Sequence, residues 1–224
     1  TERTLRGFRS AKVNVCYMPN LLDKIINKQK HFVKQVSDGA NFWNANKEKD
    51  MKFDAIVGNP PYQENDGSGA SNDAAMPIYN KFVDISRQIK PQYLSLIMPS
   101  KWMIGGRGLQ KFREDFMNDK HIEVMFDFED SSECFTNQHI DGGICYFRWN
   151  KDYEGMVDYS FKDANGNIKR ENRYLKGENA KIVIRDTRRI TLIDKVNGQA
   201  PFSKIVSSRK PFGIGTELYN QIIS

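Results

Sequence analysis

Several residues and patterns that mark familiar functional classes are scarce in this chain of 224 residues. Cysteine occurs three times, at Cys16, Cys134 and Cys145, and no two are close enough in the sequence to form a metal-binding pair. An odd number of widely spaced cysteines does not predict a disulfide framework. We interpret them as free thiols of a reducing, cytoplasmic environment.

Histidine and long apolar runs are also rare. His31, His121 and His139 lie far apart in the sequence and predict no zinc site, so we expect no bound metal. No segment approaches the ~18 consecutive apolar residues of a membrane span, and no basic and then apolar leader opens the sequence. The sequence therefore predicts neither a membrane-embedded part nor a secretion signal.

Positive charge, in contrast, is in excess. The chain has 34 Lys and Arg against 28 Asp and Glu, and a formal net charge of +6. The basic residues are concentrated in the first fifty residues and again in residues 162–210. Such a distribution favours a polyanionic partner such as DNA, although alone it is equally typical of the solvated surface of a mildly basic protein.

The most informative motif is Asn59-Pro60-Pro61-Tyr62, which follows the apolar run 53–58. The asparagine side chain offers a carbonyl acceptor, and Pro60, which has no N–H, offers only its own carbonyl oxygen. Two acceptors can thus face one NH2 group, while the Tyr62 ring can stack on a planar base. The motif predicts a site for an exocyclic amine on a ring. The alternative is a strand that ends in a double-proline turn.

Segments with strand and helix patterns alternate around this corner. Strands are predicted at 12–18, 53–57, 93–98, 123–128 and 144–149, the last two as an antiparallel pair, and helices at 20–36, 77–90 and 109–116. We expect 53–57 to be a central, buried parallel strand. Ligands of open α/β sheets collect at the carboxyl ends of the strands, which is where this order places the corner.

Three further segments have recognisable patterns. Residues 63–75 are polar and rich in Gly, Ser, Asn and Asp, which predicts either a lid or DNA-contacting loop or an ordinary surface loop. The Asn165-Gly166 pair between alternating residues predicts a β-hairpin. Beyond it, residues 182–184 are expected to form a strand and 190–196 a short helix.

Residues 54–63, Asp-Ala-Ile-Val-Gly-Asn-Pro-Pro-Tyr-Gln, resemble the catalytic motif of N6-adenine DNA methyltransferases. The segments that resemble the large restriction-modification methylases in particular are 94–102, 105–109, 127–133 and 142–147, and more weakly 207–213. The resemblance implies an α/β fold, the Rossmann-like sheet of S-adenosylmethionine-dependent methyltransferases. Residues 1–150 would hold the second half of this catalytic domain, and residues 151–224 an insertion or the beginning of a target-recognition region.

The resemblance also implies a mechanism. The target adenine is flipped out of double-stranded DNA, and Asn59 and Pro60 accept hydrogen bonds from its N6 amino group, within a catalytic motif completed by Pro61 and Tyr62. Methyl transfer is then a direct displacement, consistent with the absence of a Pro-Cys nucleophile of the cytosine-C5 methylases. Tyr62 stacks on one face of the base.

Three further residues outside the motif are expected to bind the substrate: Phe135 by the same resemblance, and Lys101 and Arg107 because they lie beside glycine-rich turns past the carboxyl edge of the sheet. Phe135 matches the position of an aromatic on the other face of the base, with packing in the core as the alternative. Lys101 and Arg107 lie where they could reach DNA phosphates, although single basic residues are more often simply solvated.

The cofactor implied by the resemblance is S-adenosylmethionine, but its glycine-rich turn is not found ahead of Phe53. The glycine pair in Phe212-Gly-Ile-Gly-Thr216 has no apolar strand before it, and Asp38 is a weakly supported acidic contact. We therefore expect a fragment of a larger methylase, inactive by itself if the cofactor half is missing. In the intact protein a nuclease is expected to be fused or associated.

Two other functions remain open at this point. The same corner serves enzymes that methylate a glutamine amide in release factors or amino groups of rRNA. A non-enzymatic alternative is a DNA-binding or specificity fragment without activity of its own. DNA is preferred as the substrate because of the segments 98–102 and 127–133 and the basic region that follows the sheet.

Overall fold

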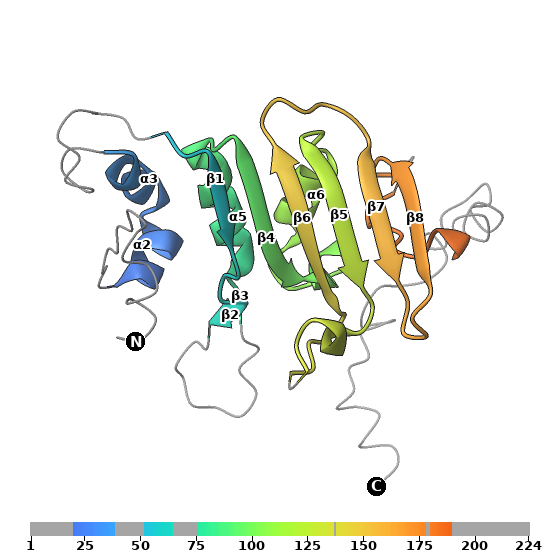
Figure 1. The fold of residues 1–224 in the computed structure, drawn as a ribbon. Helices are drawn as coiled ribbons and strands as arrows, with labels where there is room; N and C mark the ends of the chain where they lie inside the picture. The colour runs from blue at the N-terminus through green and yellow to red at the C-terminus, as the bar shows by residue number, and fades with distance from the viewer. Residues whose placement is uncertain (1–19, 39–51, 65–75, 137, 178–179, 190–224) are drawn as a thin grey trace, which may run out of the picture. The chain divides into compact units, whose positions relative to one another are not determined.

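The computed structural model describes residues 20–38, 52–64, 76–136, 138–177 and 180–189. The chain divides into two compact units, residues 1–185 and 186–224. The first contains a six-stranded sheet with helices α5 and α6 packed on one face (Figure 1). The α/β class expected from the sequence is therefore confirmed. In the second unit, the described part is the short 3-10 helix η3 (Thr187–Arg189) and Asp186 before it.

The sheet is mixed. In the order β1-β4-β6-β5-β7-β8 its strands are Ala55–Gly58, Tyr93–Pro99, Ile144–Asn150, Ile122–Phe128, Val157–Lys162 and Ile168–Arg173. β1 is parallel to β4 and β5 to β7, whereas β6 is antiparallel to both of its neighbours and β8 to β7. Four strands (β1, β4, β5 and β7) thus point the same way, so their carboxyl ends meet at one edge.

Most of the expected elements are confirmed. The β5–β6 antiparallel pair and strand β4 match their predicted ranges within about two residues, as does helix α6 (Gln110–Met117). The Asn165-Gly166 turn connects β7 and β8 as a hairpin, with Gly166 at φ +83°. This positive φ explains why the turn needs glycine at that position.

The helices before the catalytic corner and after the polar loop differ from the expectation. The single helix predicted at 20–36 is wrong: it is divided into α2 (Leu21–Asn27) and α3 (Gln29–Ser37), because Lys28 adopts φ −131° between them. Pro77 does not begin a helix either. It belongs to β3 (Met76–Pro77), which pairs with β2 (Gln63–Glu64), and α5 (Tyr79–Ile89) follows.

An aromatic core fixes α6 and the 3-10 helix η1 (Ser100–Met103) to the sheet. Trp102 of η1 and Phe147 of β6 both meet the ring of Phe116 edge to face, at centroid distances of 5.1 and 5.0 Å. These three side chains are buried. Each such pair contributes ~0.5–1.5 kcal/mol beyond the burial of apolar area. The backbone that follows β4 is therefore held rigidly at the carboxyl edge of the sheet.

Strand β1 is not the buried central strand that its sequence predicts. The exposed fraction of Val57 is 76%, and among the described residues β1 has one strand neighbour, β4. The apolar residues of this segment predict a buried strand, but they do not predict which other segments pack against it.

Past residue 150 the chain continues the same sheet, because β7 pairs with β5 and β8 with β7. The strand predicted at 182–184 is wrong: this segment has no strand partner, and its backbone is held instead by a hydrogen bond from the Val183 amide to the Met103 carbonyl (2.8 Å). The predicted segments 12–18, 190–196, 207–213 and 212–216 lie outside the described residues. None of the described helices has the length and apolar character needed to cross a membrane.

Candidate functional site

The Asn-Pro-Pro-Tyr corner leaves the carboxyl end of β1. Asn59 and Pro61 are exposed, Pro60 is buried, and Tyr62 packs with part of its ring against the core. The carbonyl of Tyr62 accepts a hydrogen bond from the amide of Ile78 (3.1 Å), next to the β2–β3 pair. These contacts fix the Tyr62 backbone at the base of the polar 63–75 loop, whose residues 65–75 are outside the described part.

The Tyr62 hydroxyl is buried and makes no hydrogen bond of normal geometry within the described residues. Burial raises the pKa of Tyr62 to about 12, with smaller contributions in the same direction from the thiols of Cys134 and Cys145, while the nearby Asn59 side chain opposes the rise. Tyr62 is therefore a neutral phenol at physiological pH. Its side chain therefore presents an aromatic ring without a charge.

Tyr62 also lines a cavity of about 710 Å³ at this edge of the sheet. The predicted residues Lys101 and Arg107 line the same cavity, and its other wall is formed by residues 138–141. Apolar walls come from Tyr79, Pro99 and Leu109. A volume in this range and a mixture of apolar walls with a few polar groups are typical of a small-molecule or nucleobase pocket.

A salt bridge spans this cavity from one polar wall to the other. Lys101 Nζ lies 2.6 Å from the Asp141 carboxylate. The hydrogen bond from Lys101 lowers the pKa of Asp141, and the positive charge of Lys101 acts in the same direction. Both side chains are more than half exposed, so water screens the pair and it contributes little stability. Arg107, also exposed, belongs to the turn before α6.

The other predicted site residues do not line this pocket. Asn59, Pro60 and Pro61 precede Tyr62 but are not among the lining residues. Phe135 is partly buried, and its amide bonds to the Ser131 carbonyl (3.0 Å) in the loop after β5. Residues 138–141 of the same loop line the cavity together with Tyr62. Asp38 follows the last residue of α3 and lines none of the cavities.

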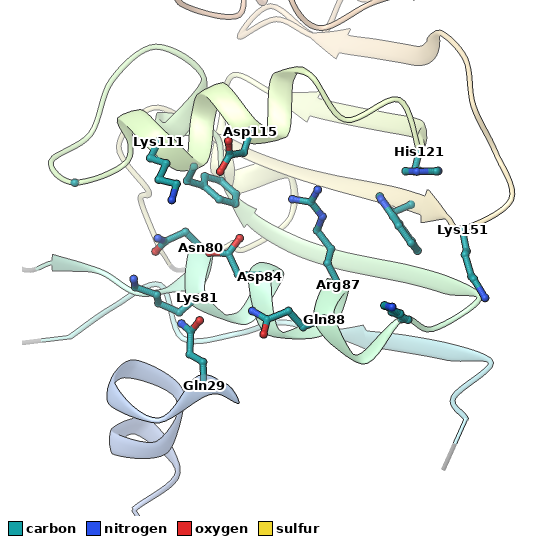
Figure 2. A pocket seen from close by; sticks show the side chains of 14 residues that line it. Gln29, Asn80, Lys81, Asp84, Arg87, Gln88, Lys111, Asp115, His121 and Lys151 are labelled. Atoms are coloured by element: carbon teal, nitrogen blue, oxygen red, sulfur yellow. The ribbon is translucent and has the colours of Figure 1, made fainter. Parts of the chain in front are cut away.

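A second cavity of about 970 Å³ lies between α5 and α6, and none of the predicted site residues lines it. Figure 2 shows Asn80 and Asp84 of α5 facing Lys111 and Asp115 of α6 across it. Burial raises the pKa of Asp84, and the charges of Arg87 and Lys81 only partly offset this. Nowhere in the described chain do three or more His, Cys, Asp or Glu side chains form a group that could hold a metal ion.

The 129–143 loop, which contains Phe135 and the pocket wall 138–141, is anchored by residues that the sequence did not single out as functional. Asp127, at the end of β5, is fully buried and forms an ion pair with Arg185 (2.6 Å). A signal was present in the sequence, since Asp127 is an acidic residue inside an apolar strand pattern. A buried carboxylate requires partners.

The family model of the Eco57I restriction-modification methylases matches residues 1–135 of this chain, which include the Asn-Pro-Pro-Tyr corner and the basic residues of the pocket. The chain belongs to this family. The resemblance seen in the sequence is therefore confirmed, and so is the expected assignment to restriction-modification methylases.

The chain is also similar to a protein of Mycoplasma pneumoniae described as an uncharacterized adenine-specific methylase, to which it is 42% identical over 108 residues. The match covers 48% of this chain and 26% of the relative, so the chain spans about a quarter of that protein's length.

Two solved structures have a similar backbone path over part of their length. One is the type I restriction-modification methyltransferase subunit from Streptococcus thermophilus, at 15% identity and a TM-score of 0.36, with 67% of this chain and 32% of the other covered. The other comes from a study of the assembly of a type I restriction-modification system, at 12% identity and a TM-score of 0.36, with coverage of 70% and 34%.

Proposed function

We propose that this chain supplies the amino-group-binding half of a site-specific DNA methyltransferase that methylates adenine at N6 in a restriction-modification system. The observation that carries the proposal is the convergence of three predicted residues on one cavity: Tyr62 of the catalytic corner, Lys101 and Arg107. These residues come from three separate segments. An aromatic ring and two cations around a pocket at the strand ends are suited to a flipped base and its flanking phosphates.

In this proposal the residues of the corner have distinct roles. The exposed Asn59 side chain and the Pro60 carbonyl accept hydrogen bonds from the N6 amino group, which orients its lone pair toward the incoming methyl group. Tyr62 stacks on the base, and Phe135, from the loop beside it, is proposed for the opposite face. Positioning of this kind provides most of the acceleration in a direct displacement, since no covalent intermediate with the enzyme is needed.

S-adenosylmethionine is the methyl donor that the family implies. In the part of the chain that the structure describes, no strand runs directly into a glycine-rich turn that opens a helix. Among the described residues, Asp38 is the one that we propose as a contact of this cofactor. We propose that the rest of the intact protein holds the cofactor beside β1, which has β4 as its one strand neighbour among the described residues, and that a nuclease is fused to or associated with that protein.

The decisive variant is Asn59→Ala in the complete methylase. We expect methyl transfer to duplex DNA to fall by roughly a hundredfold or more, because one of two acceptors of the amino group is lost. Asn172→Ala is the matched control, because Asn172 is an exposed asparagine on β8, at the other end of the sheet. Near-normal methylation by Asn59→Ala would exclude the proposed role.

The same assay separates the alternative functions. Adenine-containing duplex DNA, rRNA and a release factor are offered as acceptors, and we expect transfer to the DNA alone. Transfer to one of the other acceptors would replace the proposal. DNA binding without any transfer, and without binding of S-adenosylmethionine in calorimetry, would identify a specificity fragment instead.

A further inference from the structure

Both polar walls of the pocket are attached to one buried hydrogen-bond network. Its centre is the carboxylate of Asp127, which is 0% exposed and accepts hydrogen bonds from Ser100 Oγ (2.6 Å) and Tyr159 Oη (2.8 Å). The guanidinium of Arg185 completes it with bonds of 2.6 and 2.8 Å to the two carboxylate oxygens. We call Asp127, Arg185, Ser100 and Tyr159 the Asp127 network.

The remaining donors of Arg185 extend to the loop. Nη1 donates to the Gly142 carbonyl (2.7 Å) and Nη2 to the Phe128 carbonyl (3.1 Å), so one side chain joins the end of β5 to the last turn of the 129–143 loop. This planar arrangement of several donors is specific to arginine. A lysine at this position would have a single nitrogen for the same acceptors.

The attachment points are next to the pocket walls. Gly142 directly follows Asp141, the end of the 138–141 wall, and Ser100 directly precedes Lys101. The two walls are also joined to each other, because the Ser100 amide donates to the Gly143 carbonyl (3.0 Å). The exposed Lys101–Asp141 pair cannot fix this geometry alone, since a solvated salt bridge is weak.

We propose that Arg185 and Asp127 are positioning residues, which hold the Lys101 wall and the 138–141 wall at the separation that the target base requires. This inference rests on the proposed function of the pocket. It adds a residue outside the span matched by the family model, which ends at residue 135. Arg185 is the last residue of the unit that contains the sheet, so the network joins the end of this unit to the pocket.

The test uses three variants of the complete methylase. Arg185→Lys keeps the charge opposite Asp127 but loses the bonds to the loop. Arg185→Met removes the charge and leaves the Asp127 carboxylate buried without its counter-ion, which endangers the fold. Asp127→Asn/Arg185→Met removes both charges. The new amide oxygen can accept the bond from one of the two hydroxyls of Ser100 and Tyr159, and the amide NH2 group can donate to the other. Arg170→Met is the control, because Arg170 makes an exposed two-pronged contact with Asp158 on the same sheet.

Two measurements distinguish positioning from general support of the fold. Hydrogen exchange read on peptides of residues 129–143 should accelerate by about tenfold in Arg185→Lys and in the double variant, with peptides of β4 unchanged. Methyl transfer is measured by the incorporation of labelled methyl groups into unmethylated genomic DNA. In the same two variants, we expect the KM for DNA to rise roughly tenfold and the KM for S-adenosylmethionine to stay unchanged. Arg170→Met should match the wild type in both.

Three results would overturn the proposal. The first is that the hydrogen exchange of the 129–143 loop is unchanged in Arg185→Lys and in the double variant. The second is that the hydrogen exchange of the 129–143 loop accelerates in these variants while their KM for DNA stays that of the wild type. The third is loss of the fold in all three variants, which would assign the network to stability alone. A failure of the proposed function is recognised separately, because the wild-type protein would then transfer no methyl group to DNA while the exchange of the loop could still be measured.

Discussion

Gly143 lies so close to the carbonyl oxygen of Phe128 that a β-carbon added at this position would overlap it, and such a carbon would also come within 2.9 Å of Arg185 Nη2. Its φ of +82° is unfavourable for any other residue as well. Gly143→Ala should therefore destabilise the protein by about 3 kcal/mol or more, the sum of backbone strain and overpacking. The free energy of unfolding in urea measures this.

Gly142→Ala is the control for that prediction. Gly142 has nearly the same φ, +86°, but a β-carbon there would meet Lys101 at 3.5 Å or more, which is an ordinary contact. We expect a cost of ~1–2 kcal/mol from strain alone. Equal losses in the two variants would show that the close approach to Phe128 is not what makes glycine necessary at position 143.

Tyr62 should act through its ring and not through its hydroxyl. Tyr62→Ala is expected to weaken stacking on the target base by ~1–3 kcal/mol, whereas Tyr62→Phe should retain base flipping and leave stability unchanged or slightly higher, because the buried hydroxyl makes no hydrogen bond of normal geometry with the described residues. The fluorescence of 2-aminopurine at the target position reports flipping. If Tyr62→Phe lost flipping as completely as Tyr62→Ala, the hydroxyl would have to contact the substrate.

Arg107 should contribute more to DNA binding than Lys101, because Lys101 is already paired with Asp141. Arg107→Ala in the complete methylase is expected to reduce the slope of log K against log salt concentration by about one, the amount for one phosphate contact. Lys101→Ala should change the slope less, and Asp141→Asn should increase affinity by freeing the Lys101 charge. An unchanged slope in Arg107→Ala would leave Arg107 without a role at the phosphates.

Asp84 should make stability depend on pH in a direction opposite to that of a paired carboxylate. Its pKa in the folded protein is raised above the ordinary 3.8, first by burial, so the folded state binds the proton more tightly than the unfolded chain. Ionised Asp84 therefore destabilises the fold at neutral pH, and this penalty disappears as the pH falls through its raised pKa. Asp84→Asn should unfold at a higher temperature than the wild type at pH 7, with the difference vanishing in acid.

Asp158→Asn is the control of opposite sign for Asp84→Asn. The hydrogen bond from Arg170 lowers the pKa of Asp158, so its ionised form stabilises the fold above the ordinary pKa, and the contribution is lost as the pH falls. This variant should be slightly less stable than the wild type at pH 7, because the pair is largely exposed. A lower unfolding temperature for Asp84→Asn at pH 7 would contradict the assigned effect of burial.

The sequence predicted those parts of the fold that are determined locally. Apolar periodicity identified β4, β5, β6 and α6, and the Asn165-Gly166 pair identified the β7–β8 hairpin, because side-chain alternation and the φ of a turn depend on neighbouring residues. The burial of β1 was mispredicted because burial depends on what packs from outside. Pro77 was predicted to begin a helix because proline is common at the first position of a helix. The pairing of β2 with β3 joins Pro77 to Gln63, and a reading of the local sequence does not reveal this contact.

The candidate site shows the same division. The acceptors and the aromatic of the corner were predicted from residue chemistry, and Lys101 and Arg107 from their place beside glycine-rich turns. Of the predicted site residues, Tyr62, Lys101 and Arg107 line one cavity, whereas Asn59, Pro60, Pro61, Phe135 and Asp38 do not. Arg185 was not predicted, because its partner Asp127 is 58 residues away and only the folded chain brings them together. Long-range contacts between single charged residues leave no periodic pattern in a sequence.

The position of β1 has a practical consequence for work with this polypeptide alone. Among the described residues β1 has one strand neighbour, so on its other side the backbone donors and acceptors of this short apolar strand have no strand partner in the described part of the chain. When these 224 residues are expressed separately, we expect self-association through this strand, which co-production with the remainder of the methylase should suppress. Sedimentation of the two preparations side by side would reveal the difference.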